Sequence, residues 1–116
     1  MSSIALGAQS ILSVADAGSA ATGEGRSGFS SFATAAFQVS WEAISGTPGG
    51  TLKLQCSIDG TNYSDKSGAS AVISGTSGST IISIVSITEE FYRAVWTPNG
   101  ETGGVVAVVA TASRRS

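Results

Sequence analysis

The stretch TLKLQCSIDGTNYSD, residues 51–65, decides the fold class, because apolar and polar side chains alternate along its first half. Period-two alternation is typical of a strand with one buried face. The pattern predicts that Asp59-Gly60 ends this strand in a turn, where the Asp59 carboxylate accepts hydrogen bonds from nearby backbone N–H groups. Four side chains are predicted to point inward: Leu52, Leu54, Cys56 and Ile58.

Further strands are predicted on both sides of this stretch. In FQVSW, residues 37–41, Phe37, Val39 and Trp41 share the predicted inward face. The intervening SGTPGG, residues 45–50, has the proline and glycines of a turn, so the two strands are predicted to form an antiparallel hairpin. Short strands separated by glycine-containing turns predict an all-β fold, an antiparallel β-sandwich or jelly roll. The remaining strands are expected in ASAVIS (69–74), STIISIVSI (79–87), FYRAVWT (91–97) and GVVAVVATA (104–112).

The first 33 residues lack this alternation. We therefore expect an irregular N-terminal arm or edge segment at residues 1–33 and a β-sandwich domain at residues 34–116, with FSSFATAAF (29–37) as a turn or short helix. The apolar side chains of the first segment need a surface to cover, which is either a neighbouring subunit or an edge of their own sandwich. Together with Trp96, they are the predicted assembly contacts: Ile4, Leu6, Ile11, Leu12, Val14 and Trp96.

Composition restricts the partners. The 116 residues carry a net charge of −2, and only 12% are charged, about half the usual share. Apart from Arg114-Arg115 there is no cluster of cations, which argues against nucleic acid binding. A weakly charged surface favours a protein that partners cover, including other copies of itself. With no apolar run near ~18 residues and no basic N-terminal region, we expect neither a membrane span nor a secretory signal.

Catalytic groups are scarce in the sequence. It has no histidine, so no imidazole base stands beside a serine or cysteine, and Cys56 is the single cysteine. We therefore expect no enzyme activity, no cofactor and no metal site. Alternation places Cys56 in the core. The adjacent Glu89 and Glu90 are expected in a solvated turn rather than as an acid/base pair.

Two motifs suggest ligand sites but lack the context that such sites need. GEGRSG, residues 23–28, has the spacing of a dinucleotide-binding loop, yet no βαβ unit surrounds it, so it is interpreted as a glycine loop. Asp59, Asn62 and Asp65 supply three oxygen ligands within one loop, but their spacing fits no EF-hand, so a calcium site is not expected.

Aromatic side chains raise a different possibility, a sugar-stacking platform made of Trp41, Tyr63, Tyr92 and Trp96. Alternation assigns Trp41 to the core and leaves the side of Trp96 open. Large aromatics dominate cores and subunit interfaces, so both are preferred over a carbohydrate site. Exposure separates these hypotheses, because three coplanar, solvent-facing aromatics around a groove would favour sugar binding.

Two motifs resemble a family of small β-sandwich proteins encoded among bacteriophage structural genes. Gly50–Tyr63 matches G-T-L-K-[LV]-Q-x-S-x-D-G-x-x-[WY], and Tyr92–Pro98 matches Y-R-x-V-[YW]-T-P, within a similarity over residues 34–113. The resemblance implies that Asp59-Gly60 forms a scaffold turn with Tyr63 packed beneath it.

The resemblance also implies a function. It suggests a non-enzymatic virion component made in the host bacterial cytoplasm, which assembles as a homo-oligomer or with other virion proteins. Capsid decoration, minor capsid, spike-base and tail-associated roles all remain open. A carbohydrate-binding β-sandwich module for host-surface glycans is the alternative.

The scarcity of metal-binding side chains predicts that a chelator leaves thermal stability unchanged. A metal bound only by the folded state would stabilise it by mass action, so its removal would lower the Tm. Thermal unfolding with and without EDTA, followed by circular dichroism, tests this. A clear drop in Tm that added Ca²⁺ restores would contradict the prediction and point to Asp59, Asn62 and Asp65.

Overall fold

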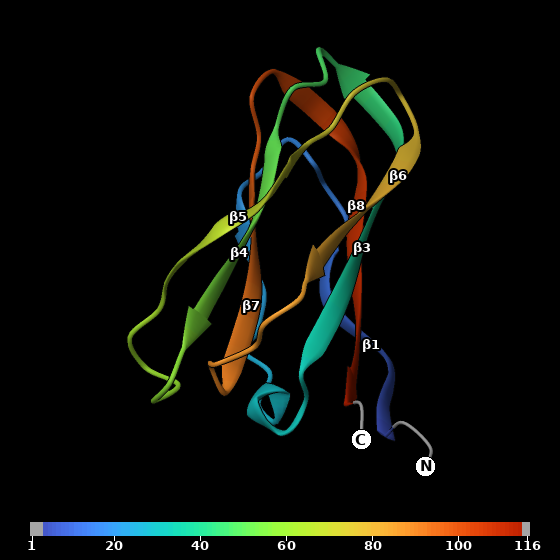
Figure 1. The fold of residues 1–116 in the computed structure, drawn as a ribbon. Coiled ribbons are helices and arrows are strands. Elements are labelled where there is room, and N and C mark those ends of the chain that lie inside the picture. The colour runs from blue at the N-terminus through green and yellow to red at the C-terminus, as the bar shows by residue number, and fades with distance from the viewer. Residues whose placement is uncertain (1–3, 115–116) are drawn as a thin grey trace.

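Two antiparallel sheets of four strands pack face to face and enclose the core (Figure 1). The structure is a computed structural model that describes the backbone of residues 4–114 and the side chains of residues 9–113. The first residues of β1 and the last of β8 lie side by side at one end of the molecule. The all-β sandwich expected from the sequence is confirmed.

The described residues form eight strands and one short 3-10 helix. One sheet, called sheet A here, has the strand order β1-β8-β3-β6, and the other, sheet B, has the order β2-β7-β4-β5. In chain order the elements are β1 (Ile4–Val14), β2 (Ala21–Thr22), η1 (Phe29–Ser31), β3 (Thr34–Gly46), β4 (Thr51–Ser57), β5 (Ser64–Val72), β6 (Gly78–Ile84), β7 (Phe91–Thr97) and β8 (Glu101–Arg114).

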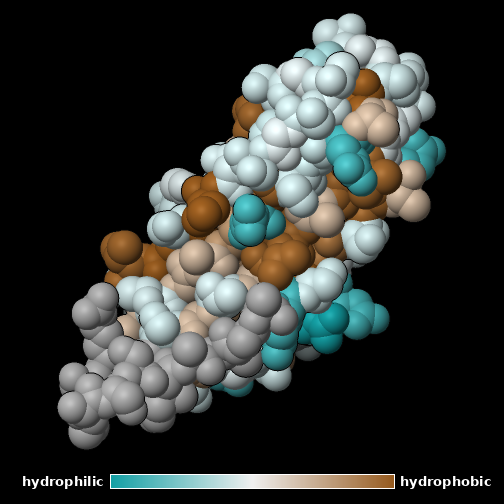
Figure 2. Space-filling view, turned by 90° about the vertical axis from the view of Figure 1, so that its right-hand side faces the viewer, coloured by the Kyte–Doolittle hydropathy of each residue, from teal (hydrophilic) through white to brown (hydrophobic). Residues whose placement is uncertain are grey.

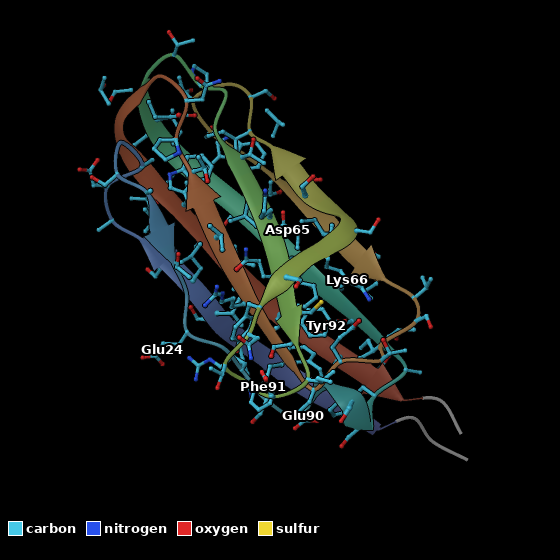
Figure 3. All side chains as sticks on the ribbon, turned by 90° about the vertical axis from the view of Figure 1, so that its left-hand side faces the viewer. Glu24, Asp65, Lys66, Glu90, Phe91 and Tyr92 are labelled. Atoms are coloured by element: carbon cyan, nitrogen blue, oxygen red, sulfur yellow. The ribbon has the colours of Figure 1, made fainter. Side chains whose placement is uncertain are left out.

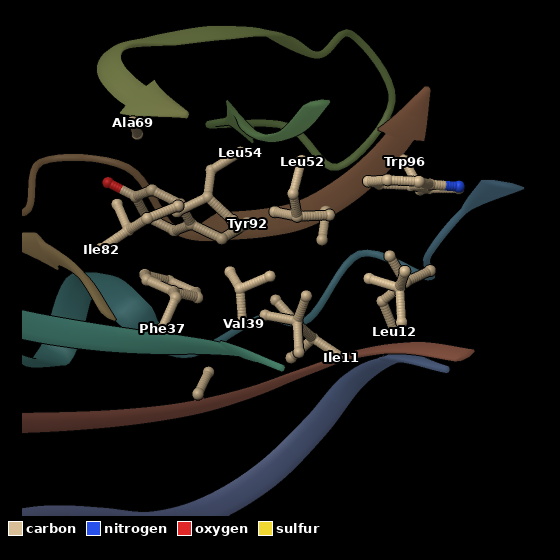
Figure 4. Close-up of a cluster of buried hydrophobic side chains, with 14 of the residues drawn as sticks. Ile11, Leu12, Phe37, Val39, Leu52, Leu54, Ala69, Ile82, Tyr92 and Trp96 are labelled. Atoms are coloured by element: carbon tan, nitrogen blue, oxygen red, sulfur yellow. The ribbon is translucent and has the colours of Figure 1, made fainter. Parts of the chain in front are cut away.

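The core lies between the facing sheets, and period-two alternation supplies most of it (Figure 4). Phe37 and Val39 of β3 face Leu52 and Leu54 of β4, and all four are fully buried. At one end Phe29, Phe37 and Tyr92 form an aromatic cluster with ring centroids 5.0–5.8 Å apart. Such pairs add stability beyond the area they bury.

The predicted β3–β4 hairpin is wrong. β3 pairs with β6 and β8 in sheet A, whereas β4 pairs with β5 and β7 in sheet B. Residues 47–50 therefore carry the chain from one sheet to the other instead of reversing it within a sheet. The link between β7 and β8 crosses between the sheets at the same end, beside this crossing.

Glu101 joins the two crossings. Its buried carboxylate accepts hydrogen bonds from the backbone N–H of Gly49 at 2.8 Å, Gly50 at 2.6 Å and Asn99 at 2.6 Å. Burial alone raises the pKa of Glu101, but these three donors outweigh it and lower the pKa. Only glycine fits at Gly50, because a Cβ there would lie 2.4 Å from the Trp96 ring.

Residues 4–14 of the first segment form a strand of sheet A, so the irregular arm expected there is corrected for these residues, and residues 15–33 contain only β2 and η1. β1 pairs with β8 from Ile4↔Arg114 to Val14↔Val106 and forms an edge of sheet A, the alternative that the sequence left open. Two register shifts interrupt the pairing, one between Leu6 and Gln9 and one between Ser10 and Leu12. Such bulges change which side chains face inward and so break the alternation.

The end of β4 also departs from the predicted alternation. Ile58 is 79% exposed, Ser57 is buried in its place, and Cys56 is only partly buried against the core. Ser57 turns inward because its hydroxyl donates to Asp59 at 2.8 Å and accepts from the N–H of Gly60 at 2.9 Å. The inward row predicted for this strand therefore holds for Leu52 and Leu54, holds in part for Cys56, and fails at Ile58.

We predict that Glu101→Ala lowers the free energy of unfolding by about 2–3 kcal/mol, because it leaves buried backbone N–H groups without an acceptor. Chemical denaturation followed by circular dichroism measures the change. The control is Glu42→Ala on the exposed side of β3, which should stay within about 0.5 kcal/mol of the unmodified protein. Equal effects of the two substitutions would show that Glu101 does not hold the crossings together.

Candidate functional site

The outward side of sheet A carries no charge over its central region. Strand register and exposure place nine small or uncharged side chains there, called the small-residue face here: Ala36, Gln38, Ser40, Ser79, Ile81, Ser83, Ala107, Val109 and Thr111. Figure 2 looks onto this side of the molecule and shows mostly pale, weakly polar atoms, with hydrophobic patches and a few strongly hydrophilic residues among them. A surface of this kind offers shape and apolar contact to a partner but no charge for recognition.

A shallow hollow of about 430 Å³ lies at one end of the small-residue face. Thr34, Ser83, Val85 and Thr111 are among the residues that line it, and its lining contains no titratable side chain. Val85 is 82% exposed at its rim. The hollow therefore continues the uncharged surface and holds no group suited to acid–base or nucleophilic chemistry.

The outward side of sheet B is polar (Figure 3). Asp65 on β5 accepts hydrogen bonds from Lys53 at 3.2 Å and from Gln55 at 3.0 Å, both on β4. Gln55 in turn accepts from Arg93 Nε on β7 at 2.8 Å, and the Arg93 guanidinium lies 4.0 Å from the centre of the Tyr63 ring. Hydrogen bonds from Gln55 and Lys53 lower the pKa of Asp65. The network joins three neighbouring strands, and its polar side chains bond to one another.

Glu89 lies in the link from β6 in sheet A to β7 in sheet B. Its carboxylate pairs with Lys66 Nζ at 3.1 Å and accepts a hydrogen bond from the Tyr92 hydroxyl. Burial alone raises the pKa of Glu89, but the bonds from Tyr92 and Lys66 outweigh it and lower the pKa to about 2. Burial, followed by the bond to Glu89, raises the pKa of Tyr92. Burial and the nearby Glu89 likewise raise the pKa of the Cys56 thiol, which makes it a weak nucleophile.

The neighbouring Glu90 holds a different part of the chain. It accepts hydrogen bonds from the N–H of Gly28 at 2.8 Å and from the Ser30 hydroxyl, which attaches η1 to the end of the sandwich. The solvated turn expected for Glu89 and Glu90 is therefore wrong for Glu89, whose side chain is only 20% exposed and pairs with Lys66, while Glu90 lies at the surface and bonds to Gly28 and Ser30. Nothing in the sequence indicated these partners, because Lys66 lies 23 residues from Glu89 and Gly28 lies 62 residues from Glu90.

The Asp59 turn forms as predicted. One carboxylate oxygen accepts from the backbone N–H of Thr61 at 2.8 Å and of Asn62 at 2.9 Å, and these bonds lower the pKa of Asp59, with Asn62 contributing most. The ring beneath Gly60 belongs to Phe91, not to Tyr63, which corrects the packing that the resemblance implied.

The residues weighed as a calcium site have other partners. Asp59 bonds to its own turn, and Asp65 bonds to Lys53 and Gln55. Within the described part of the chain, no three His, Cys, Asp or Glu side chains come together to hold a metal ion. The same residues contain no helix long and apolar enough to cross a membrane.

The predicted assembly contacts lie mainly in the protein's own core. Ile11, Leu12 and Val14 are buried against sheet B, and Trp96 is fully buried with its indole N–H donating to the Ala17 carbonyl at 3.0 Å. The side chains of Ile4 and Leu6 lie outside the described residues. The surfaces that sequence reasoning missed are the small-residue face and the sheet B network, because strand register across the fold creates both.

None of the eight aromatic side chains is exposed. Five are buried, and Phe32, Tyr63 and Phe91 are half-buried. Tyr63 has the Arg93 guanidinium over its ring and its hydroxyl close to Gly25. The three coplanar, solvent-facing aromatics that would have favoured sugar binding are therefore not present.

No protein-family model and no curated protein sequence matches the chain. Among solved structures, one titled Family 16 Carbohydrate Binding Module-2 has a TM-score of 0.45 and 8% identity, over 83% of this chain and 70% of that one. The crystal structure of FLHE has a TM-score of 0.43 and 17% identity, over the full length of both chains. Both scores are low, so neither likeness identifies a family.

We predict that Glu89 makes stability pH-dependent in acid. Its pKa is lower in the folded chain than the ordinary value of 4.5, so its contribution is present above pH 4.5 and is lost as pH falls toward 2. Glu89→Gln should therefore be less stable than the unmodified protein at neutral pH, and the difference should shrink toward pH 2. Denaturation midpoints across this range measure it, with the exposed Glu42→Gln as control. A difference that stays constant with pH would contradict the assignment.

Proposed function

We propose that this protein is a non-enzymatic structural component of a bacteriophage particle that acts by assembling with copies of itself and with other virion proteins. The uncharged small-residue face is the observation that carries the assembly part of the proposal, and the virion part rests on the resemblance of Gly50–Tyr63 and Tyr92–Pro98 to the bacteriophage family. A monomer that lives free in solution usually keeps charge distributed over its surface. An uncharged region that spans about three strands of a sheet is a suitable surface for another protein to cover.

The chemistry of the chain supports a role without catalysis. The sequence has no histidine, and the pKa of its one cysteine is raised by burial. The carboxylates described above bond to backbone N–H groups and to lysine, serine, tyrosine or side-chain amide groups, and they stabilise turns, strand pairs and sheet crossings. These are scaffold interactions, and a virion scaffold needs stability and surfaces rather than reactive groups.

Glycan binding is the second candidate. The sheet B face supports it, because Gln55, Asp65 and Arg93 are hydrogen-bonding side chains on a flat sheet surface. Stacking against an exposed aromatic ring is missing, and the polar groups already bond to one another. The assembly proposal therefore has the stronger support.

The assembly proposal predicts oligomers whose population grows with protein concentration, measured by light scattering after size-exclusion chromatography. It also predicts that mass spectrometry finds the chain in particles purified on a density gradient from lysates of the cells that encode it. A glycan array run in parallel tests the alternative and should show no binding. A monomer at every concentration, absent from particles and bound to a defined glycan, would contradict the proposal.

A further inference from the structure

Every open sheet has edges whose unpaired N–H and C=O groups can pair with another chain, and proteins usually block them. Three of the four edges in this sandwich are blocked. β1 carries two register shifts, and Arg26 donates to the Ser10 carbonyl on it at 3.2 Å. β2 is only two residues long. β5 has a register shift in its pairing and carries the charged Asp65 and Lys66.

β6, the other edge of sheet A, has none of these protections. It pairs with β3 in unbroken register from Ala35↔Ile84 to Trp41↔Gly78, and among the described residues β3 is its only strand partner. It contains no proline and no charge, and no charged residue occurs anywhere from 67 to 88. Ile81, in the middle of the strand, is 60% exposed. A regular, uncharged edge of seven residues is suited to strand addition.

The pattern of β6 matches a second β6 strand. Its outward side chains are Ser79, Ile81 and Ser83, which are symmetric about Ile81. In an antiparallel pair with a two-fold axis at Ile81, the two Ile81 side chains face each other and each Ser79 faces the Ser83 of the second copy. Only the residue on the axis faces its own copy in this register, so a charge at position 81 would lie opposite an identical charge. β6 has no charge to repel.

We propose that β6 of one copy pairs with β6 of a second copy in this register. The pairing joins two four-stranded sheets A into one continuous sheet and extends the small-residue face across both copies. The inference rests on the proposed assembly function and identifies β6 as the strand edge through which two copies first associate. One shared edge is small beside the roughly 1,600 Å² of a standard stable interface, so the pair is expected to be weak and reversible alone.

Ile81→Lys tests the edge directly. It removes an apolar contact and places two lysines opposite each other, so the dimer dissociation constant should rise by at least about tenfold. Ile58→Lys is the matched control, because Ile58 is the same residue type, 79% exposed and outside β6, and should leave the constant unchanged. Sedimentation of each variant measures the constant, and circular dichroism checks the fold.

Ile81→Cys provides a second test that does not require weakening the pair. Directly opposed residues of antiparallel strands have Cα atoms about 4.5–5.5 Å apart, which is within disulfide range. With Cys56→Ser as background, Ile81→Cys should form a disulfide-linked dimer on mild oxidation, and Ile58→Cys should not.

The outcomes separate the two proposals. If the protein associates but Ile81→Lys changes nothing and Ile81→Cys does not cross-link, the β6 inference is wrong while the assembly function stands. If the unmodified protein is monomeric at every concentration and Ile81→Cys does not cross-link, the β6 inference is wrong, and both proposals are wrong if the chain is also absent from particles and binds a defined glycan. Cross-linking confined to Ile81→Cys supports the β6 pair.

Discussion

The buried carboxylate of Glu101 is the interaction on which the arrangement of the two sheets depends. Three backbone N–H groups donate to it, two from the β3–β4 link and one from the β7–β8 link. Both links cross from one sheet to the other, so the same carboxylate holds β3 beside β8 in sheet A and lets β4 lie beside β7 in sheet B. A buried charge is tolerated only when such donors compensate its lost hydration. The sandwich closes at this end because they do.

The alternation of apolar and polar residues correctly predicted which side chains of a strand are buried, wherever the strand keeps a regular register. Phe37 and Val39 on β3 and Leu52 and Leu54 on β4 point inward as the sequence indicates. The partner of each strand was not predictable in this way, because a turn rich in glycine and proline serves a hairpin and a sheet crossing equally well. The distinguishing residue, Glu101, lies about 50 positions further along and looks like an ordinary surface carboxylate in the sequence.

The first segment illustrates a second limit. Residues 4–14 show little alternation because two bulges shift the register, which leaves the adjacent Ile11 and Leu12 both buried. The sequence showed that these apolar side chains need a surface to cover. In the structure, the protein's own core covers those whose side chains are described. The surfaces available to partners arise instead from side chains that are far apart in sequence and adjacent in the sheets. Ile81, Gln38 and Val109 meet on the small-residue face only because β6, β3 and β8 are neighbours.

The protein is therefore best understood as a sandwich with an uncharged central region on one face and one unblocked edge, whose N-terminal strand belongs to its own fold. Backbone amide hydrogen exchange at low and high protein concentration tests this description most directly. The account predicts that the β1 amides that donate to β8 are protected at every concentration. The β6 amides that point away from β3, at the free edge of sheet A, should gain protection as concentration rises. Exchange of β6 that is unaffected by concentration, together with β1 protection that appears only on association, would contradict it.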